Sequence, residues 1–244
     1  LVISVVAAVV LYRYLSTLSI APEADAAEFF VLLVVVAGVL MVNALIAVGV
    51  IQLIARFSYL LPGRANYVAT RRVGRGARMT WKRVAALYFL AFTAGISSWI
   101  SAIPEIDADP ALNMITGDIP TGVALTAVFG AILLVASTLL TQALAVVEQK
   151  QLTKSLYFVG APAKYHTSVA IREIGVPMVL VTLLGFGMGN LLGFVMVAVP
   201  VDVLPKLVLF ATLLALVLAG CIAAVAATGK LRECVLAETG RLND

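Results

Sequence analysis

Residues 148–177 read EQKQLTKSLYFVGAPAKYHTSVAIREIGVP and stand between two long apolar runs. The stretch is charged, and Gly160, Ala161 and Pro162 interrupt it. Glycine and proline end helices more readily than they continue them, so the pattern predicts two helical pieces that meet at a turn. Pro177 closes the stretch and is expected to decouple it from the apolar helix that follows. The apolar runs on both sides set how the rest of the chain folds.

The composition is that of a chain that folds in a lipid bilayer. Of 244 residues, 62% are hydrophobic and only 12% are charged, and the mean hydropathy is +1.08. A soluble domain carries about 25% charged residues, so a soluble globule is excluded. The formal net charge is +4, but the basic residues lie between apolar runs, where membrane topology explains them better than nucleic-acid binding does. We expect no nucleic acid among the partners.

The apolar runs are long enough for about six transmembrane helices. They cover approximately residues 1–20, 29–54, 84–102, 121–147, 174–199 and 207–227. An acidic loop at 104–120 and a very short loop at 202–206 join two pairs of these spans, and the charged tail is expected to form a short helix. The predicted fold class is therefore all-α, a polytopic helical membrane protein.

Lysine and arginine fall almost entirely on one side of these spans. Residues 56–83 hold eight of them, residues 148–177 hold four and the tail holds three, which together make 15 of the 17 in the chain. Basic loops stay in the cytoplasm, so the first residue and the C terminus are both expected there. Within the basic segment, residues 66–72 are predicted to lie on the bilayer as an amphipathic helix, with Tyr67 and Val68 toward lipid and the arginines toward phosphate headgroups.

No catalytic or metal-binding motif stands in the sequence. A phosphate-binding loop would need a Ser or Thr after its Gly-Lys pair, but a leucine follows Gly229-Lys230. The single histidine, His166, has no Cys, Asp or second His near it in sequence, and the two cysteines stand more than three helical turns apart. We therefore expect no catalytic residue, no metal site and no cofactor held by this chain.

The predicted span at 174–199 carries glycines on one helical face. Gly185, Gly189 and Gly193 form two overlapping Gly-x-x-x-Gly pairs. Because glycine has no side chain, another helix can approach this face closely. Asn190 stands in the same segment and has two interpretations, a hydrogen bond across a dimer interface or one within the bundle. We expect these four residues to serve helix packing.

The span at 121–147 is followed by an ordered series of features: Glu148, the polar run 149–154, Gly160-Ala161, the basic run 164–172, Glu173, the glycine-rich span and the short hairpin. From residue 121 to the C terminus, this pattern resembles the FtsX-like permease domain of MacB-type ABC transporters. Upstream, YVATRRVGRGARMTWKRVAALYFLAF at 67–92 resembles the junction that opens the second half of long members with two repeats.

This resemblance also implies a division of the chain. Residues 1–55 would be the last two helices of a first repeat, and residues 56–83 a basic cytoplasmic linker. Residues 84–244 would form a second repeat with four transmembrane helices and a coupling element at 148–177. The chain would then be the C-terminal part of a longer protein. It departs from the family in carrying Gln149, Gln151 and Tyr157 where arginines are usual.

The function implied by the resemblance is that of a permease subunit in the bacterial cytoplasmic membrane. It would couple ATP hydrolysis by a separate cytoplasmic ATPase dimer to movement across the bilayer, for export, extraction or mechanotransmission. The chain itself would be no enzyme, and the ATPase would bind ATP and Mg²⁺. Further implied partners are a second permease copy or a paralogue, the lipid bilayer, and a periplasmic or extracellular protein. The implied ATPase-coupling residues are Glu148, Lys150, Leu152, Lys154, Leu156, Tyr157, Val159, Gly160, Ala161, Lys164 and Glu173.

Alternatives to this function remain open at the level of sequence. The apolar stripe of Leu152, Leu156 and Val159 fits a groove on an ATPase subunit, or it contacts the protein's own membrane domain. A non-transporting scaffold that controls a cell-wall hydrolase or a sensor kinase would share every feature named here. An ion-coupled secondary carrier is a third class, and the lack of paired carboxylates within the predicted spans counts against it.

Overall fold

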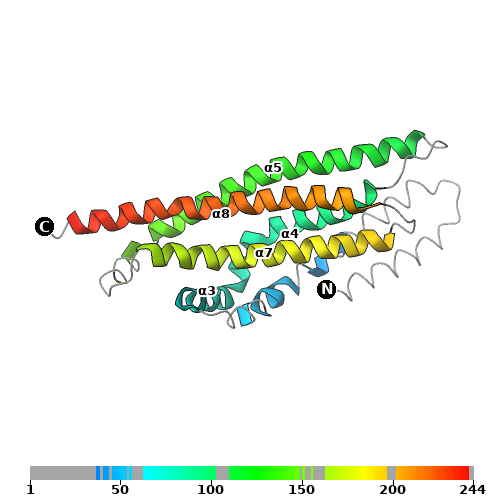
Figure 1. The fold of residues 1–244 in the computed structure, drawn as a ribbon. Helices are drawn as coiled ribbons and strands as arrows, with labels where there is room; N and C mark the ends of the chain where they lie inside the picture. The colour runs from blue at the N-terminus through cyan, green and yellow to red at the C-terminus, as the bar shows by residue number, and fades with distance from the viewer. Residues whose placement is uncertain are drawn as a thin grey trace.

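The computed structural model describes residues 37–38, 41–43, 46–53, 55–56, 63–102, 110–148, 150–151, 155, 163–196 and 202–241. Within these ranges the chain is helical and has no β-strand, so the predicted all-α class is confirmed for them. The helices with defined bounds are α3 (Arg64–Arg75), α4 (Ala77–Ile100), α5 (Pro110–Glu148), α7 (Ala163–Met196) and α8 (Leu204–Arg241) (Figure 1).

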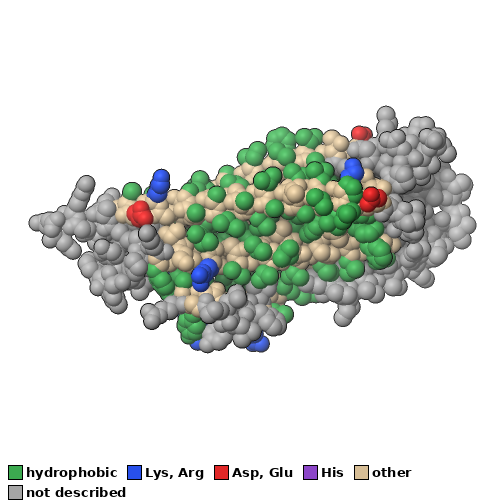
Figure 2. All heavy atoms as spheres, in the orientation of Figure 1, with side chains coloured by type: hydrophobic (Ala, Val, Ile, Leu, Met, Phe, Trp, Pro, Cys, Tyr) green, Lys and Arg blue, Asp and Glu red, His purple; other side chains and the backbone are tan. Residues whose placement is uncertain are grey.

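Four of the described helices are long and apolar enough to cross a membrane. The candidate spans are Ala77–Ile100, Thr121–Glu148, Thr167–Val195 and Leu204–Leu231. They correspond to the third to sixth predicted spans, whereas the span at 1–20 and much of the span at 29–54 lie outside the described residues. Hydrophobic side chains cover the middle of the face in Figure 2, and the charged side chains visible there lie toward its two ends. The chain therefore has the helices of a polytopic membrane protein.

The described helices extend beyond the apolar runs that predicted them. α4 begins at Ala77 instead of near residue 84, and α7 begins at Ala163 instead of near residue 174. Residues 110–120, predicted as part of a loop, belong to α5, and the tail to Arg241 continues α8. Hydropathy marks the part of a helix that suits lipid, whereas the helix itself continues through Arg, Lys, Glu, Leu and Ala, which all favour it.

α7 is continuous at the proline where the sequence predicted a separation. The helix passes through Pro177, whose side chain is fully buried. A buried proline removes one backbone hydrogen bond but need not end a transmembrane helix when neighbouring helices cover the turn. The predicted turn at residues 160–162 lies outside the described residues.

The four candidate spans pack as two closely associated pairs (Figure 1). α4 has its most extensive contact with α7, and α5 has its most extensive contact with α8. α8 also contacts α7 and α4, which joins the pairs. In its apolar window α4 is 56% buried and α5 only 11% buried. α4 is therefore the central span, and α5 is the outer one.

Most basic residues on the described helices lie at one end of the bundle. α3, the start of α4, the end of α5, the start of α7 and the end of α8 lie at this end (Figure 1), which we call the basic end. Its basic residues on the described helices include Arg71, Arg72, Arg75, Arg78, Lys82, Arg83, Arg172 and Lys230. Lys206 lies near the start of α8, at the opposite end.

Candidate functional site

The structure describes four of the predicted coupling residues, and these lie at the basic end. Glu148 is exposed as the last residue of α5, Lys150 is half-buried in a helical segment, and Lys164 lies in the first turn of α7. The other predicted residues up to the turn, Leu152, Lys154, Leu156, Tyr157, Val159, Gly160 and Ala161, lie outside the described residues. The described part of the site therefore comprises the end of α5, Lys150 and the first turns of α7 with the residues that pack against them.

Glu173 has a partner within the chain. Its carboxylate accepts a hydrogen bond from the Arg72 guanidinium of α3, with 3.4 Å between Nη1 and Oε2. The two side chains keep 35% (Arg72) and 23% (Glu173) of their surface exposed, so water screens the pair partly. The sequence predicted Glu173 as an ATPase-coupling residue and Arg72 as one of the arginines that face phosphate headgroups. It did not pair them, because residues 101 positions apart show no local spacing signal. The pair joins α3 to the basic half of α7.

α3 rests on α7 through small and polar side chains. Asn66, Ala69, Thr70 and Val73 are buried, and with Pro177 they line a void of only about 10 Å³. The Thr70 hydroxyl donates to the Asn66 carbonyl at 2.9 Å, so its burial leaves no unmet donor. The contact therefore seats α3 directly over the proline turn of α7.

This seating adds a protein contact to the predicted amphipathic helix. The sequence predicted that Tyr67 and Val68 face lipid, which stays a prediction, and the structure shows that another face of α3 packs on α7. Tyr67 is exposed on the other side, and the Arg71 guanidinium lies 5.3 Å from the centroid of its ring. A face of Asn, Ala and Thr is weakly apolar, so hydropathy alone does not identify it as an interface.

Gly63 fixes where α3 begins. Its φ of 129° lies in a region that side chains other than glycine rarely adopt, and its carbonyl accepts from the Tyr67 amide at 3.1 Å. A Cβ at this position would also lie 3.1 Å from Nη1 of Arg172. The turn into α3 therefore places its backbone against the basic half of α7.

In the apolar half, the three glycines of α7 face α4 and bring the two backbones together. A Cβ on Gly185 would lie 2.6 Å from the Tyr88 carbonyl oxygen, and one on Gly189 would overlap the Phe92 carbonyl. A Cβ on Gly193 would meet the ring of Trp99 at 2.6 Å. Without side chains at these positions, dispersion contacts between the helices accumulate along the face.

Asn190 completes this interface with hydrogen bonds inside the bundle. Its Oδ1 accepts from the Ser98 hydroxyl at 3.0 Å and from the Trp99 indole N–H at 3.1 Å. Its Nδ2 donates to the Phe186 carbonyl at 2.8 Å. Of the two interpretations that the sequence left open, the structure therefore shows the one within the bundle. The sequence did not identify Gly95 of α4, where a Cβ would lie 2.6 Å from the same Phe186 carbonyl oxygen.

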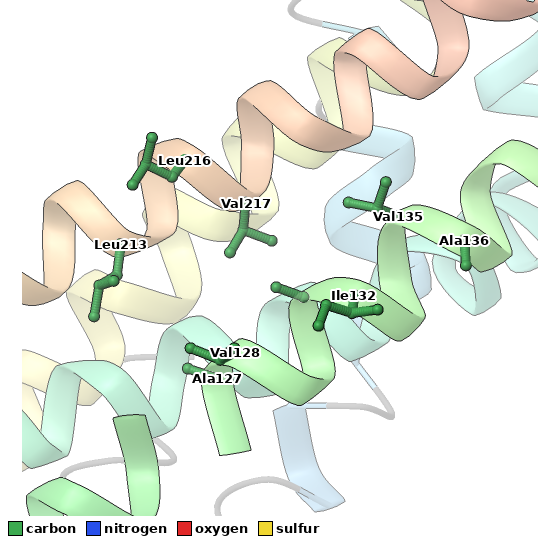
Figure 3. A pocket seen from close by; sticks show the side chains of 9 residues that line it. Ala127, Val128, Ile132, Val135, Ala136, Leu213, Leu216 and Val217 are labelled. Atoms are coloured by element: carbon green, nitrogen blue, oxygen red, sulfur yellow. The ribbon is translucent and has the colours of Figure 1, made fainter. Parts of the chain in front are cut away.

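The contact between α5 and α8 is less tightly closed. The two helices touch at Gly220 of α8, where an added Cβ would lie 3.1 Å from Cγ2 of Val135 on α5. Beside this contact lies an open groove of about 590 Å³, shown in Figure 3. Its lining is apolar throughout: Ala127, Val128, Ala131, Ile132, Val135, Ala136, Leu213, Leu216 and Val217. The two helix pairs therefore differ in how firmly they are packed.

The described residues offer contacts and charges but no reactive group in a cluster. No three His, Cys, Asp or Glu among them approach closely enough to hold a metal ion. Both cysteines are free thiols on α8, with Cys221 buried and Cys234 exposed. The arrangement offers one continuous helix, α7, and a concentration of basic residues at the basic end.

Comparison with known proteins yields no match, since no protein-family model, curated protein or solved structure matches the chain. The case for a function therefore rests on the residues and contacts described here.

Proposed function

We propose that the chain is the membrane subunit of an ATP-binding cassette complex in the bacterial cytoplasmic membrane. In this proposal, a separate cytoplasmic ATPase moves the basic end, and the bundle carries that movement across the bilayer. The resemblance of residues 121–244 to FtsX-like permease domains supports the proposal. The observation that carries it is the continuity of α7, which runs from the polar residues of the basic end to Met196 without interruption.

The length of α7 suits this role. Its 34 residues span about 50 Å at the usual rise of an α-helix, about 20 Å more than the hydrocarbon core of a bilayer. The excess carries Lys164, Arg172 and Glu173 at the basic end. A subunit that binds there would therefore hold one end of a rod whose other end lies in or beyond the bilayer.

The packing of α7 determines what would move with it. The glycine face and the Asn190 hydrogen bonds lock its apolar half to α4, and the pair between Arg72 and Glu173 joins its basic half to α3. Helices packed this closely move as one body. α5 contacts α8 and α4 but buries only 11% of its apolar window, so we expect its neighbours to hold it less firmly than they hold α7. We therefore expect α3, α4 and α7 to move together relative to α5.

The test replaces the predicted contact with the ATPase. Leu156→Asp combined with Gly160→Asp would bury a carboxylate in that contact, so the ATPase should no longer co-purify from membranes and its stimulated hydrolysis should be lost. Membrane insertion of the variant should be unchanged. Leu204→Asp is the matched control, because Leu204 is 69% exposed at the opposite end, and this variant should keep the partner.

Two outcomes would contradict the proposal. If an ATPase co-purifies equally well with the double variant and the native chain, residues 148–160 are not the coupling element. If no protein with a nucleotide-binding motif co-purifies with the native chain, the assignment to an ATP-driven complex is wrong.

A further inference from the structure

A second feature of the basic end lies on the side of α3 that α7 does not cover. The helical residues 46–53, 55 and 56 lie beside α3, and a pocket of about 550 Å³ opens between them and α3. Pockets of this size accommodate small ligands and headgroups. The lining consists of Gln52, Ala55, Arg56, Thr70, Arg71, Gly74 and Arg75. Three arginines from two separate segments therefore line one hollow.

The charges of this pocket are not balanced within the described part of the chain. The ion pair that the described residues form joins Arg72 to Glu173, and it lies on the side of α3 that faces α7, outside the pocket. Arg56, Arg71 and Arg75 are exposed and have no carboxylate within ion-pair distance among the described residues. Three like charges around one hollow repel each other unless an anion enters. The pocket therefore favours a ligand with negative charge.

The position of the pocket indicates where this anion comes from. α3 is separated only by Gly76 from Ala77, the first residue of a candidate span. Arg56 follows directly on the apolar run that predicts the second span. Tyr67, exposed on α3 and in contact with Arg71, is a residue type enriched at the level of lipid headgroups. The pocket therefore lies beside the start of α4 and the end of the second apolar run, which is where lipid headgroups would lie if both segments cross a bilayer.

We propose that this pocket binds the phosphate of an anionic phospholipid headgroup. Guanidinium forks match phosphate oxygens in pairs of parallel hydrogen bonds, and arginine is the side chain best suited to such bidentate contacts. The amide of Gln52 adds a polar group for the rest of the headgroup. The bound lipid would hold residues 46–56 to α3 by neutralising charge on both. This inference does not depend on the ATPase partner.

The test measures lipid binding to the whole chain in neutral detergent by native mass spectrometry. The probes are phosphatidylglycerol, phosphatidylcholine and inorganic phosphate. The native chain should prefer phosphatidylglycerol to phosphatidylcholine. An arginine near an anionic lipid surface contributes about 1 kcal/mol, which is about fivefold in affinity. Arg75→Gln should therefore weaken phosphatidylglycerol binding about fivefold, and the triple change of Arg56, Arg71 and Arg75 to Gln about a hundredfold.

The matched control removes the same charge outside the pocket. Arg78, Lys82 and Arg83 lie on the first turns of α4 and do not line the pocket, so changing all three to Gln should leave phosphatidylglycerol binding within about twofold of native. Melting temperatures in detergent show whether each variant is folded. If the pocket triple does not fold, the single Arg75→Gln variant decides.

Several results would overturn the inference. Equal losses in the two triple variants would mean that overall charge, and not the pocket, attracts the lipid. Unchanged phosphatidylglycerol binding in a folded pocket variant would reject the site. If inorganic phosphate displaces phosphatidylglycerol at equal concentration, the pocket is a site for a soluble anion and not for a lipid. If a pocket variant keeps its lipid but loses a protein partner, the pocket is a protein-binding surface.

Discussion

Gly189→Ala adds one methyl group at a point where the backbones of α7 and α4 touch. The new Cβ would overlap the Phe92 carbonyl of α4 and lie 3.1 Å from the Cα of Gly95. Ordinary contacts between carbon and a carbonyl oxygen are about 3.3–3.6 Å. Both atoms that the methyl meets are backbone atoms of a helix, so they cannot rotate away. The helices must therefore separate, by about 1 Å.

The cost of this separation follows from what the interface holds. Overpacking a well-filled contact costs about 1–3 kcal/mol. The Asn190 amide accepts two hydrogen bonds from α4, at 3.0 and 3.1 Å, and a 1 Å shift breaks both. Interhelical hydrogen bonds in membrane proteins contribute about 0.6 kcal/mol each. We expect Gly189→Ala to lower the free energy of unfolding by about 2–4 kcal/mol.

The assay can use the natural fluorophores of the interface. The chain has two tryptophans, and both are on α4. In a Trp81→Phe background, the remaining Trp99 donates its indole N–H to Asn190 and so reports on the contact itself. Its emission would be followed as SDS is titrated into mixed micelles, and the midpoint and slope give the free energy of unfolding.

Gly187→Ala is the matched control on the same helix. A Cβ at Gly187 meets nothing within 4 Å, so the added methyl group should cause no collision. Alanine is favoured over glycine within a helix by about 0.5–1 kcal/mol, and the control should be neutral or slightly more stable than the native chain. If the two variants unfold at the same SDS fraction, the close approach of α4 and α7 does not carry the stability assigned to it.

Two further predictions concern the basic end. Arg72→Gln and Glu173→Gln should each lower the free energy of unfolding by about 0.5–1 kcal/mol. The loss in the double variant should be no larger than the loss in one single variant. If the two losses add up in this double-mutant cycle, the pair does not interact. In intact cells, a membrane-impermeant maleimide should leave Cys234 unlabelled, and after permeabilisation it should label Cys234 but not the buried Cys221. Labelling of Cys234 before permeabilisation would refute the cytoplasmic position predicted for the end of α8.

The class of the fold and the existence of the later spans could be predicted from sequence for a physical reason. A helix that crosses a bilayer needs about 20 consecutive apolar residues, and so long a run is visible without any partner. Helix ends are different, because lipid does not set them. α7 begins about 11 residues before its predicted span, since the intervening basic segment continues the helix as readily as apolar residues do.

The contacts between helices at the site were harder to predict from the sequence than the spans. The glycine face could be read from spacing alone, because the 4-residue period lies within one helix. Gly95, the partner of this face on α4, could not be predicted in the same way, since no second glycine stands 4 residues away from it on the same helix. The pair between Arg72 and Glu173 and the arginine pocket both join distant segments of the chain. Long-range pairings of this kind depend on how helices rotate and cross, which local pattern does not fix.

Pro177 shows how the proposed movement depends on α3. Proline has no N–H, so α7 lacks the hydrogen bond that residue 177 would donate to the carbonyl of Glu173. At this weak turn Thr70 and Val73 of α3 cover the helix, and Arg72 holds the side chain of Glu173 itself. We therefore expect α3 to brace this turn, so that α7 stays rigid only while α3 is in place.

This dependence can be measured by hydrogen exchange of the amides at 174–181. Arg72→Gln should weaken the contact between α3 and α7 and therefore speed hydrogen exchange at 174–181 several-fold. Exchange at 185–193, where α7 packs against α4, should change little. Pro177→Ala restores the missing N–H, so in this background the same arginine change should have a much smaller effect. If Arg72→Gln leaves exchange at 174–181 unchanged in both backgrounds, α7 is rigid by itself. In that case α3 contributes nothing to the transmission of movement, and the Arg72–Glu173 pair is only a surface contact.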